Sequence, residues 1–428
     1  MWRRPHETRR NPSRSAVLRR VGIALSLLFF ATLSVASAQD TDQPDPSLVE
    51  AWTEGTFSLR FNLRYEGVSD ESPPVRDNDA QALTLRTVGG YKTKSWKGLQ
   101  FHLEFEDVTA IGGDGRYNNA GFGALNNGVR NRPVIADPEI TEISQVRLIY
   151  AGLPETTLDL GRREIVLGNS RFVGNVGWRQ NHQSFEALTV VNESLDNVRF
   201  SYSLVDKVNR ITGEAKPMTS HFFNVGGALK KINLTGYVYA LDYDRFADRG
   251  LSTTTFGLRA DGRRAFGDGD LSFLYDFEIA EQSDAGDNTS NVDAGYLRLD
   301  LGVGWGKLSL RLAREVLDGG EGKGAFQTPL ATLHKWNGWA DKFLTTPAGG
   351  LEDTNINLSG NYDPYTFTVR YHRFEADSTN AHYGNELDMQ ATYETSWGQT
   401  FGFKAAFYDA DEFAFDSDKY MLWSGWGF

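Results

Sequence analysis

The chain contains no cysteine, which excludes disulfide bridges, zinc–thiolate sites and catalytic thiols. It also lacks an excess of basic charge, since its net charge is −12 and nucleic-acid binding requires a basic surface. Long hydrophobic runs are scarce as well. The apolar run Val21 to Val35 is short for a membrane-spanning helix, and no later stretch could span as one. No metal site or cofactor is predicted.

The N-terminus resembles an export signal. Seven arginines precede the apolar run, and Ala36-Ser37-Ala38 follows it as a small-residue cleavage site. We therefore expect a signal peptide over 1–38 and a mature chain that begins at Gln39. The alternative is a protein anchored by a single span. Residues 39–55 are then a short polar lead-in on the periplasmic side.

What the mature chain has in abundance is alternation. In Thr56 to Glu66, five apolar side chains face one way, while polar ones, among them Arg60 and Arg64, face the other. This pattern suits a strand with lipid on one side and water on the other, although a half-buried sandwich strand shows it too. The connections distinguish the two, because short turns alternate with longer loops along the whole chain.

These patterns predict an all-β fold: a transmembrane antiparallel up-and-down β-barrel of 18 strands over 56–428, in one domain, with 16 strands still possible. Its two longest outer loops are expected at 108–139 and 318–353. The expected strands are 56–66, 79–92, 99–107, 140–151, 156–165, 184–191, 198–207, 220–228, 231–242, 251–260, 270–281, 291–302, 307–317, 354–362, 365–374, 384–396, 400–409 and 418–428.

The last strand carries the clearest localisation signal. Tyr420, Leu422, Trp426 and the terminal Phe428 share one face, and a transmembrane barrel must pair its last strand with its first. The aromatic end resembles the signal that hands bacterial proteins to the outer-membrane assembly machinery. We expect an integral outer-membrane protein in contact with membrane lipid and lipopolysaccharide. An ordinary soluble edge strand is the alternative.

Two segments stand out as candidates for a constriction. The first, Gly161 to Phe185, gathers Arg162, Arg163, Arg171 and Arg179 among other polar residues and could narrow the pore. The second is the outer loop at 318–353, in which Trp336 and Trp339 are too apolar for a free loop and could stack on a sugar ring. Self-packing of each segment is an equally simple explanation. The glycine-rich loop 108–139 is either an inward plug or a flexible outer loop.

These two segments, Gly161 to Phe185 and TPLATLHKWNGWADKF at 328–343, resemble the alginate-export family of bacterial outer-membrane proteins. The resemblance extends over the strand plan of the mature chain. It implies a monomeric 18-stranded barrel that carries polyuronate or similar material, with the inward-facing arginines as its pore residues.

The alternation assigns both signs of charge to the inner face. The expected inward arginines, which are candidate pore-lining residues, are Arg60, Arg64, Arg86, Arg147, Arg163, Arg199, Arg259, Arg298, Arg311 and Arg370. The expected inward acids are Glu104, Glu106, Glu186, Asp276, Glu278, Asp300, Glu315, Glu386, Asp388 and Glu394. By count the lumen is therefore no more basic than acidic. These charges could select anions, or could only pair across the lumen.

The sequence favours a passive outer-membrane channel for small hydrophilic solutes, with anionic carbohydrate as the favoured class. A general porin is the first alternative, and a structural or adhesive barrel without conductance is the second. An enzyme is not expected, because no histidine lies in a recognisable nucleophile or acid–base motif and no Gly-x-Ser-x-Gly elbow occurs.

Overall fold

The computed structural model describes residues 45–71, 79–112, 115–267, 270–320 and 322–428, so the expected signal peptide and the start of the lead-in lie outside the described residues. All of these residues belong to one compact unit, Asp42–Phe428. Eighteen strands form within it, as the alternation predicted. They are β1 Thr56–Asp70, β2 Asp79–Lys92, β3 Leu99–Gly112, β4 Ile140–Leu153, β5 Thr156–Arg163, β6 Ser184–Leu195, β7 Val198–Asn209, β8 Ala215–Leu229, β9 Ile232–Ala240, β10 Thr253–Ala265, β11 Leu271–Asp284, β12 Asp293–Trp305, β13 Leu308–Leu317, β14 Leu351–Tyr362, β15 Tyr365–Glu375, β16 His382–Glu394, β17 Thr400–Ala410 and β18 Ser417–Gly427.

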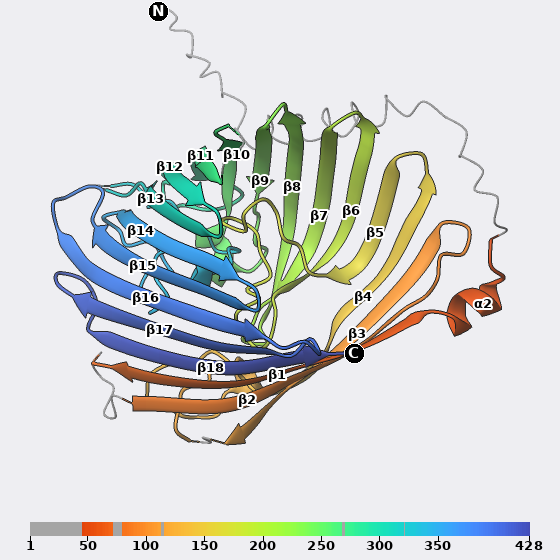
Figure 1. The fold of residues 1–428 in the computed structure, drawn as a ribbon, viewed down its shortest axis with the longest axis horizontal. Coiled ribbons are helices and arrows are strands. Elements are labelled where there is room, and N and C mark those ends of the chain that lie inside the picture. The colour runs from red at the N-terminus through yellow and green to blue at the C-terminus, as the bar shows by residue number, and fades with distance from the viewer. Residues whose placement is uncertain (1–44, 72–78, 113–114, 268–269, 321) are drawn as a thin grey trace, which may run out of the picture. The chain divides into compact units, whose positions relative to one another are not determined.

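The strands form a closed antiparallel ring (Figure 1). Each strand pairs with the next one in sequence, and β18 returns to β1 in a register that joins Arg60 to Gly427 and Asp70 to Ser417. The carbonyl oxygen of Phe428 also accepts a 3.0 Å hydrogen bond from the amide of Leu59. Closure leaves no unpaired strand edge, which is the condition for a sheet to stand in lipid.

Short turns occupy one end of the barrel. Five of them contain two residues, 154–155, 196–197, 230–231, 306–307 and 363–364. Asn197 and Gly306 take positive φ values of 61° and 55°, the conformation that tight hairpins require. In outer-membrane barrels the short turns face the periplasm. The other end carries the long loops, although they are shorter than expected. Strand β3 runs on to Gly112 and β14 starts at Leu351, because backbone pairing continues beyond the apolar belt that the alternation follows.

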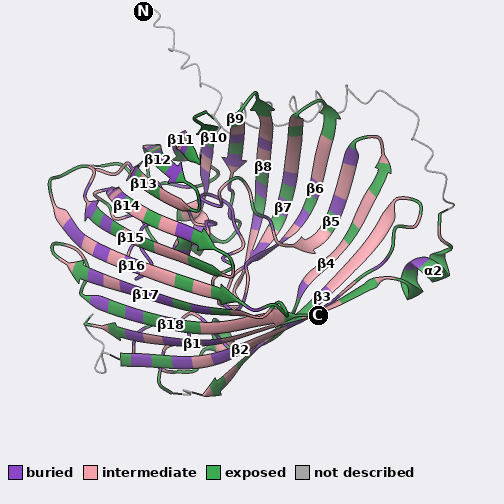
Figure 2. Ribbon diagram, viewed as in Figure 1, coloured by how far each residue is buried: buried purple, intermediate pink, exposed green. Residues whose placement is uncertain are grey.

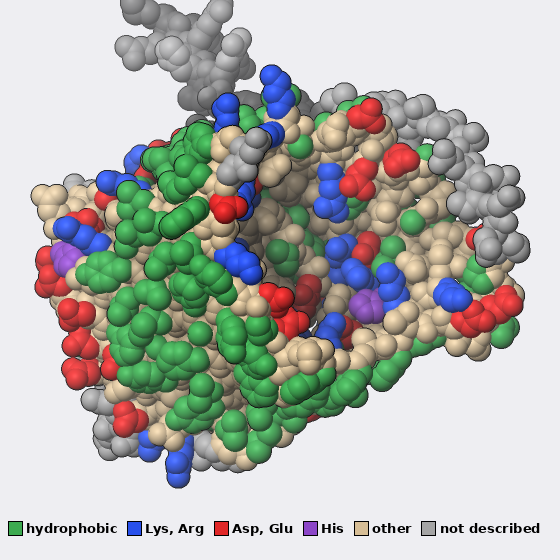
Figure 3. Space-filling model, in the orientation of Figure 1, with side chains coloured by type: hydrophobic (Ala, Val, Ile, Leu, Met, Phe, Trp, Pro, Cys, Tyr) green, Lys and Arg blue, Asp and Glu red, His purple; other side chains and the backbone are tan. Residues whose placement is uncertain are grey.

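The two faces of the wall differ as predicted. Along β12, the side chains from Leu297 to Trp305 that face outward are 39% to 69% exposed, while those between them turn inward. Figure 2 shows this alternation of burial on strand after strand, and Figure 3 shows apolar side chains covering the outer face. A closed barrel with an apolar outer band is the architecture of an integral outer-membrane protein.

Two outer loops fold into the ring of strands and fill part of the lumen (Figure 1). They are the β5–β6 loop, 164–183, and the β13–β14 loop, 318–350. The loops pair with each other through Val173 and Leu330, and the amide of Gly174 donates to the Leu330 carbonyl over 2.9 Å. Phe172, Phe326, Leu330, Trp339 and Phe343 pack with inward aromatic residues of the wall, so the main apolar core lies inside the barrel.

The loop between β3 and β4 also turns towards the wall. Its Tyr117 and Ile135 are buried against Val68, Ala80 and Ala82 on the inner face of β1 and β2. Of the two arrangements considered for this segment, the structure shows the inward one. In the lead-in, α2 spans Leu48–Thr53 and is closed by a capping box between Ser47 and Glu50. The sequence contains this signal, but the lead-in was expected to be only polar chain.

Candidate pore site

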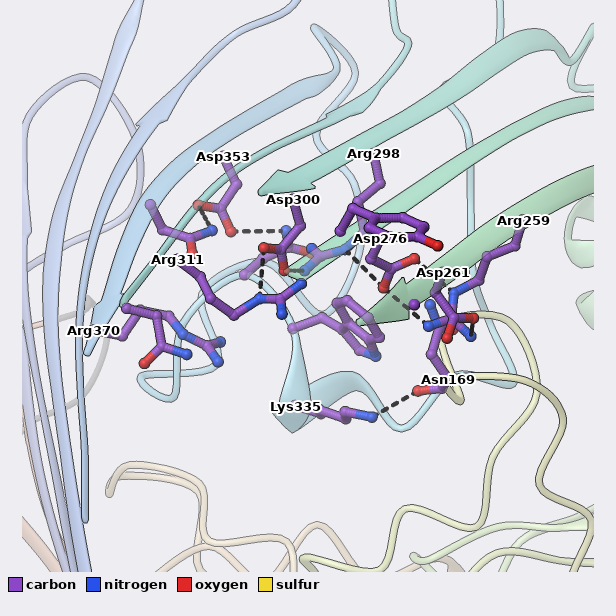
Figure 4. Close-up of a pocket in the computed structure, with 16 residues that line it drawn as sticks. Asn169, Arg259, Asp261, Asp276, Arg298, Asp300, Arg311, Lys335, Asp353 and Arg370 are labelled. Atoms are coloured by element: carbon purple, nitrogen blue, oxygen red, sulfur yellow. Dashed lines mark hydrogen bonds and ion pairs between the residues drawn. The ribbon is translucent and has the colours of Figure 1, made fainter. Parts of the chain in front are cut away.

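A cavity of about 390 Å³ lies on the inner face of β10–β15, where the wall meets the β13–β14 loop (Figure 4). Four of the expected pore arginines reach it, one each from β10, β12, β13 and β15: Arg259, Arg298, Arg311 and Arg370. Lys335 of the loop adds a fifth cation. The remaining charged and amide lining residues are Asp261, Asp276, Asp300, Asp353, Asn169, Asn337, Asn355 and Asn357. We call this site the basic cavity.

Three of the arginines are held by carboxylates of the same wall. Arg259 Nε lies 2.8 Å from Asp276 Oδ1, and Asp300 accepts from both Arg298 and Arg311 over 2.7 Å. These pairs fix the guanidinium groups on neighbouring strands and leave part of each group facing the cavity (Figure 4). A guanidinium has five donors, so one carboxylate does not exhaust it.

The other two cations have no such partner. Among the described residues, no carboxylate oxygen lies within 4.0 Å of the charged nitrogens of Arg370 or Lys335, and Arg370 Nε has no hydrogen-bond partner. Lys335 Nζ donates to the carbonyl oxygen of Asn169 over 2.8 Å. A buried donor nitrogen without a hydrogen bond, such as Arg370 Nε, is costly unless an acceptor reaches it. The basic cavity therefore offers two cations to an anionic solute.

Trp336 gives the cavity its aromatic surface. Its ring centroid lies 5.0 Å from Arg298 Cζ, 5.3 Å from Arg171 Cζ and 5.3 Å from Lys335 Nζ. Contacts of this kind hold cations by attraction to the electron-rich face of the indole. The ring therefore keeps Lys335 and Arg298 close to each other against their mutual repulsion.

Arg171 positions this part of the loop. It is fully buried, and it donates to Glu315 Oε1 over 2.9 Å, to Thr328 Oγ1 over 3.2 Å and to Asn337 Oδ1 over 3.0 Å. One side chain of the β5–β6 loop thus bonds both to the wall and to two points of the β13–β14 loop on either side of Trp336. A planar fork of donors suits this task better than an ammonium group.

A second set of charges lies deeper, where the loops meet β1, β17 and β18. It consists of Arg64, Glu66, Asp137, Arg179, Asp341 and Lys419, all of them buried or nearly so, and we call it the buried charge network. Asp341 Oδ2 lies 3.0 Å from Arg179 Nη2 and 2.7 Å from Lys419 Nζ, and Arg179 also bonds to Glu66 over 3.0 Å. Arg64 bonds to Asp137 and to the carbonyl oxygen of Trp178.

Next to this network, His334 links the loop to the wall. Its Nδ1 lies 2.8 Å from Asp341 Oδ1, and its Nε2 lies 3.1 Å from Lys404 Nζ, which sits between the rings of Trp178 and Trp339. Burial lowers the pKa of His334 to about 3, so the ring is neutral and accepts from Lys404. Burial alone would raise the pKa of Asp341, but Lys419 and His334 hold it well below its usual range.

The expected pore residues therefore fall into three groups. Arg259, Arg298, Arg311 and Arg370 meet at the basic cavity with Trp336. Arg64, Arg171 and Arg179 are buried in loop contacts, and Trp339 packs in the core. The others line the remaining wall beside carboxylates: Arg60 by Glu104, Arg86 by Glu106, Arg147 and Arg163 by Asp159, Arg162 by Glu186 and Glu142, and Arg199 by Glu193.

Exposure separates the two signs of charge on the inner face. Of the ten arginines assigned there from the sequence, Arg64 alone is buried. Seven of the ten acids are buried: Glu104, Glu106, Glu278, Asp300, Glu315, Glu386 and Asp388. Several of these acids hold the loops, as when Glu386 Oε1 accepts from the amide of Ala340 over 2.7 Å. Among these twenty residues the arginines are therefore more accessible to water than the acids. Figure 3 shows both Lys or Arg and Asp or Glu side chains around the central hollow.

Sequence reasoning missed Lys335 and the amides of β14. Lys335 directly precedes Trp336 in the segment that was chosen for its tryptophans, so it could have been predicted as a neighbour of Trp336 in the pore. Asn169 reaches the cavity only because the β5–β6 loop folds inward. A place in the lumen was one of the two arrangements considered for its segment, Gly161 to Phe185.

No protein-family model matches the chain, and no curated protein matches its sequence. Solved structures of outer-membrane porins of the Occ and Opd group do match its fold. OccAB4 of Acinetobacter baumannii has a TM-score of 0.68 at 11% identity, covering 87% of this chain and 97% of its own. OccK9 (OpdG) of Pseudomonas aeruginosa has a TM-score of 0.67 at 12% identity, covering 87% and 98%. OccD3 (OpdP) of the same organism has a TM-score of 0.63 at 16% identity, covering 92% and 95%. The fold is thus that of a porin-like outer-membrane barrel, and these structures lend no support to the alginate-export resemblance.

Proposed function

We propose that this chain is a monomeric, passive outer-membrane channel for small hydrophilic solutes that prefers anions, with acidic sugars as the favoured class. One observation carries the proposal: seven of the ten expected inner-face acids are buried, several of them in loop contacts, while nine of the ten arginines are not buried. A lumen whose accessible charge is positive raises the local concentration of anions and repels cations.

The basic cavity supplies the chemistry for recognition. Arg370 and Lys335 can donate to a carboxylate, and the guanidinium fork matches carboxylate geometry. Asn355 and Asn357 offer amide groups for hydroxyls, and the Trp336 ring can pack against the CH face of a sugar. Cations, amides and one aromatic ring on one wall suit a hydroxylated carboxylate better than an apolar or a cationic solute. Oligouronates are the first such solutes to test, because each of their rings carries both a carboxylate and hydroxyl groups.

Conductance of the refolded mature protein in planar bilayers tests the proposal. We expect open steps, an anion-selective reversal potential in a salt gradient, and block by oligouronates but not by neutral oligosaccharides. Steps without ion preference or block would indicate a general porin. The absence of steps would indicate a structural barrel.

The double variant Arg370→Ser/Lys335→Ser should lower anion preference and weaken uronate block several-fold. Its matched control is Arg373→Ser, because Arg373 lies on the same strand as Arg370 but faces outward, where it pairs with Glu375 over 2.8 Å. Equal selectivity in the double variant and the control would remove the basic cavity from the proposal.

A further inference from the structure

The short helix α2 is attached to the outside of the barrel wall. Trp52 packs against Phe101 with ring centroids 5.5 Å apart, and Phe101 belongs to the outward face of β3 together with Phe105. The hydroxyl of Tyr91, at the end of β2, donates to the Trp52 carbonyl. The amide of Lys94 donates to the Ala51 carbonyl over 3.0 Å, so the backbone of the helix is fixed to the first short turn.

Three apolar side chains of α2 stay exposed in spite of these contacts. Leu48, Val49 and Trp52 are 50%, 70% and 49% exposed, although the helix is well formed and closed by its capping box. If this helix were surrounded by water, the exposure of three large apolar side chains would be unfavourable, so an apolar contact is expected to cover them. Their position at the short-turn end, on the outer side of the wall, places them where lipid begins.

The rest of that end carries an outward aromatic belt. Exposed aromatic side chains line it on β12 to β18: Trp305, Tyr362, Tyr365, Tyr393, Trp397, Phe401 and Phe428. Bands of this kind mark the level of the lipid headgroups in outer-membrane barrels. Beside β1 to β3 the same level is occupied by Phe57 and by Trp52 of α2. The helix thus adds an aromatic side chain to this belt.

We propose that α2 is a membrane-interface anchor whose apolar face, Leu48, Val49 and Trp52, enters the periplasmic leaflet of the outer membrane. The occupant of this face is lipid, because the face is continuous with the lipid-facing wall through Phe101. Interfacial helices bind in this way, with apolar side chains at the boundary between headgroups and acyl chains. The anchor fixes the depth and orientation of the N-terminal part of the barrel. This inference does not depend on which solute the channel carries.

The absence of cysteine allows a direct test in the whole mature protein. Val49→Cys is labelled with an environment-sensitive fluorophore after reconstitution into phospholipid vesicles, and quenching is compared for lipid-borne and water-soluble quenchers. Leu48→Cys repeats the measurement on the same face. Leu148→Cys, on the outward face of β4, is the lipid reference, and Asp196→Cys, on an exposed short turn, is the aqueous reference.

We expect the labels at positions 48 and 49 to resemble the lipid reference, with lipid-borne quenching at least about threefold stronger than at position 196. A label at 49 as open to the aqueous quencher as the one at 196 would overturn the anchor. Protection from both quenchers would overturn it as well, because it would mean that a second copy of the chain, and not lipid, covers the face.

Discussion

The basic cavity and the buried charge network are built from the same kinds of charged side chain, but the two sites differ in their access to water. In the network, Arg179 and Asp341 are buried and each bonds to more than one opposite charge. In the cavity, Arg370 and Lys335 have space in front of them and, among the described residues, no carboxylate oxygen within 4.0 Å of their charged nitrogens. An arginine on the inner face of a barrel is therefore not a pore residue by position alone. Its partners decide whether it holds a loop or meets a solute.

The largest expected effect comes from breaking the network. Asp341→Asn leaves Arg179 and Lys419 without their shared carboxylate, and removing one partner of a buried pair costs about 3–5 kcal/mol. We expect an earlier thermal transition and noisy, larger conductance steps as the β13–β14 loop leaves the wall. Asp293→Asn is the matched control, because Asp293 pairs with Lys323 on the surface. Similar transitions in the two variants would show that the network does not hold the loop.

Removing the contacts of Arg171 should lower the free energy of unfolding by less than the Asp341→Asn substitution does. Arg171→Met leaves Glu315 with the Tyr296 hydroxyl at 2.7 Å and the Asn337 amide at 2.6 Å, so we expect a loss of about 2–3 kcal/mol. Selectivity should fall with it, because Trp336 and Lys335 lose their fixed position. Arg171→Lys should not restore selectivity, since an ammonium cannot make the three separate contacts. Full recovery of ion preference in the lysine variant would contradict a positioning role.

The pH dependence of stability provides a third comparison. The folded pKa of His334, about 3, lies below its ordinary value of 6.5, so the unfolded chain takes up the proton first as pH falls. The neutral His334 therefore contributes fully to the free energy of unfolding above about pH 6.5, and this contribution is lost as the pH falls towards 3. The slope is up to about 1.4 kcal/mol per pH unit. Thermal transitions measured between pH 7 and pH 4 should fall accordingly, and His334→Gln should flatten the slope. An unchanged slope in that variant would assign the pH dependence to other groups.

The smallest effect on ion selectivity is expected from replacing an arginine on the first strands of the barrel. The sequence placed Arg60, Arg64 and Arg86 among the candidate pore-lining residues. In the structure, Arg60 and Arg86 pair with Glu104 and Glu106, and Arg64 is buried. We expect Arg60→Ser to change the reversal potential only slightly, since its charge is already balanced. A shift as large as that of the Arg370→Ser/Lys335→Ser variant would mean that paired arginines select ions as well as free ones do.

The barrel itself could be predicted from the sequence because lipid imposes a regular rule on it. Every spanning strand must be apolar outside and its backbone must pair with neighbours, so alternation and turn length together report strand number and closure. The ends of β3 and β14 were placed wrongly because backbone pairing continues where the lipid, and with it the alternation, stops. The capping box at Ser47 and Glu50 was a local signal for α2 that alternation could not report.

The site was predicted only in part, for a physical reason. Alternation assigns a side chain to a face, which correctly brought Arg259, Arg298, Arg311 and Arg370 to one wall. It does not say which charges a folded loop will cover. The inner face was equally acidic and basic by count, but seven of its ten expected acids are buried, and loops bond to several of them, such as Glu315 and Glu386. Contacts between segments more than 100 residues apart, such as Arg171 with Glu315, leave no mark in local sequence.

The account rests on accessible charge rather than total charge. The most direct measurement is therefore the reversal potential of the wild-type channel in a salt gradient at low ionic strength, where screening is weakest. The whole chain carries a net charge of −12, so total charge alone favours cations. Accessible charge predicts a preference for anions. A cation-selective reversal potential would contradict the account, because the buried acids would then govern the lumen in spite of their contacts with the loops.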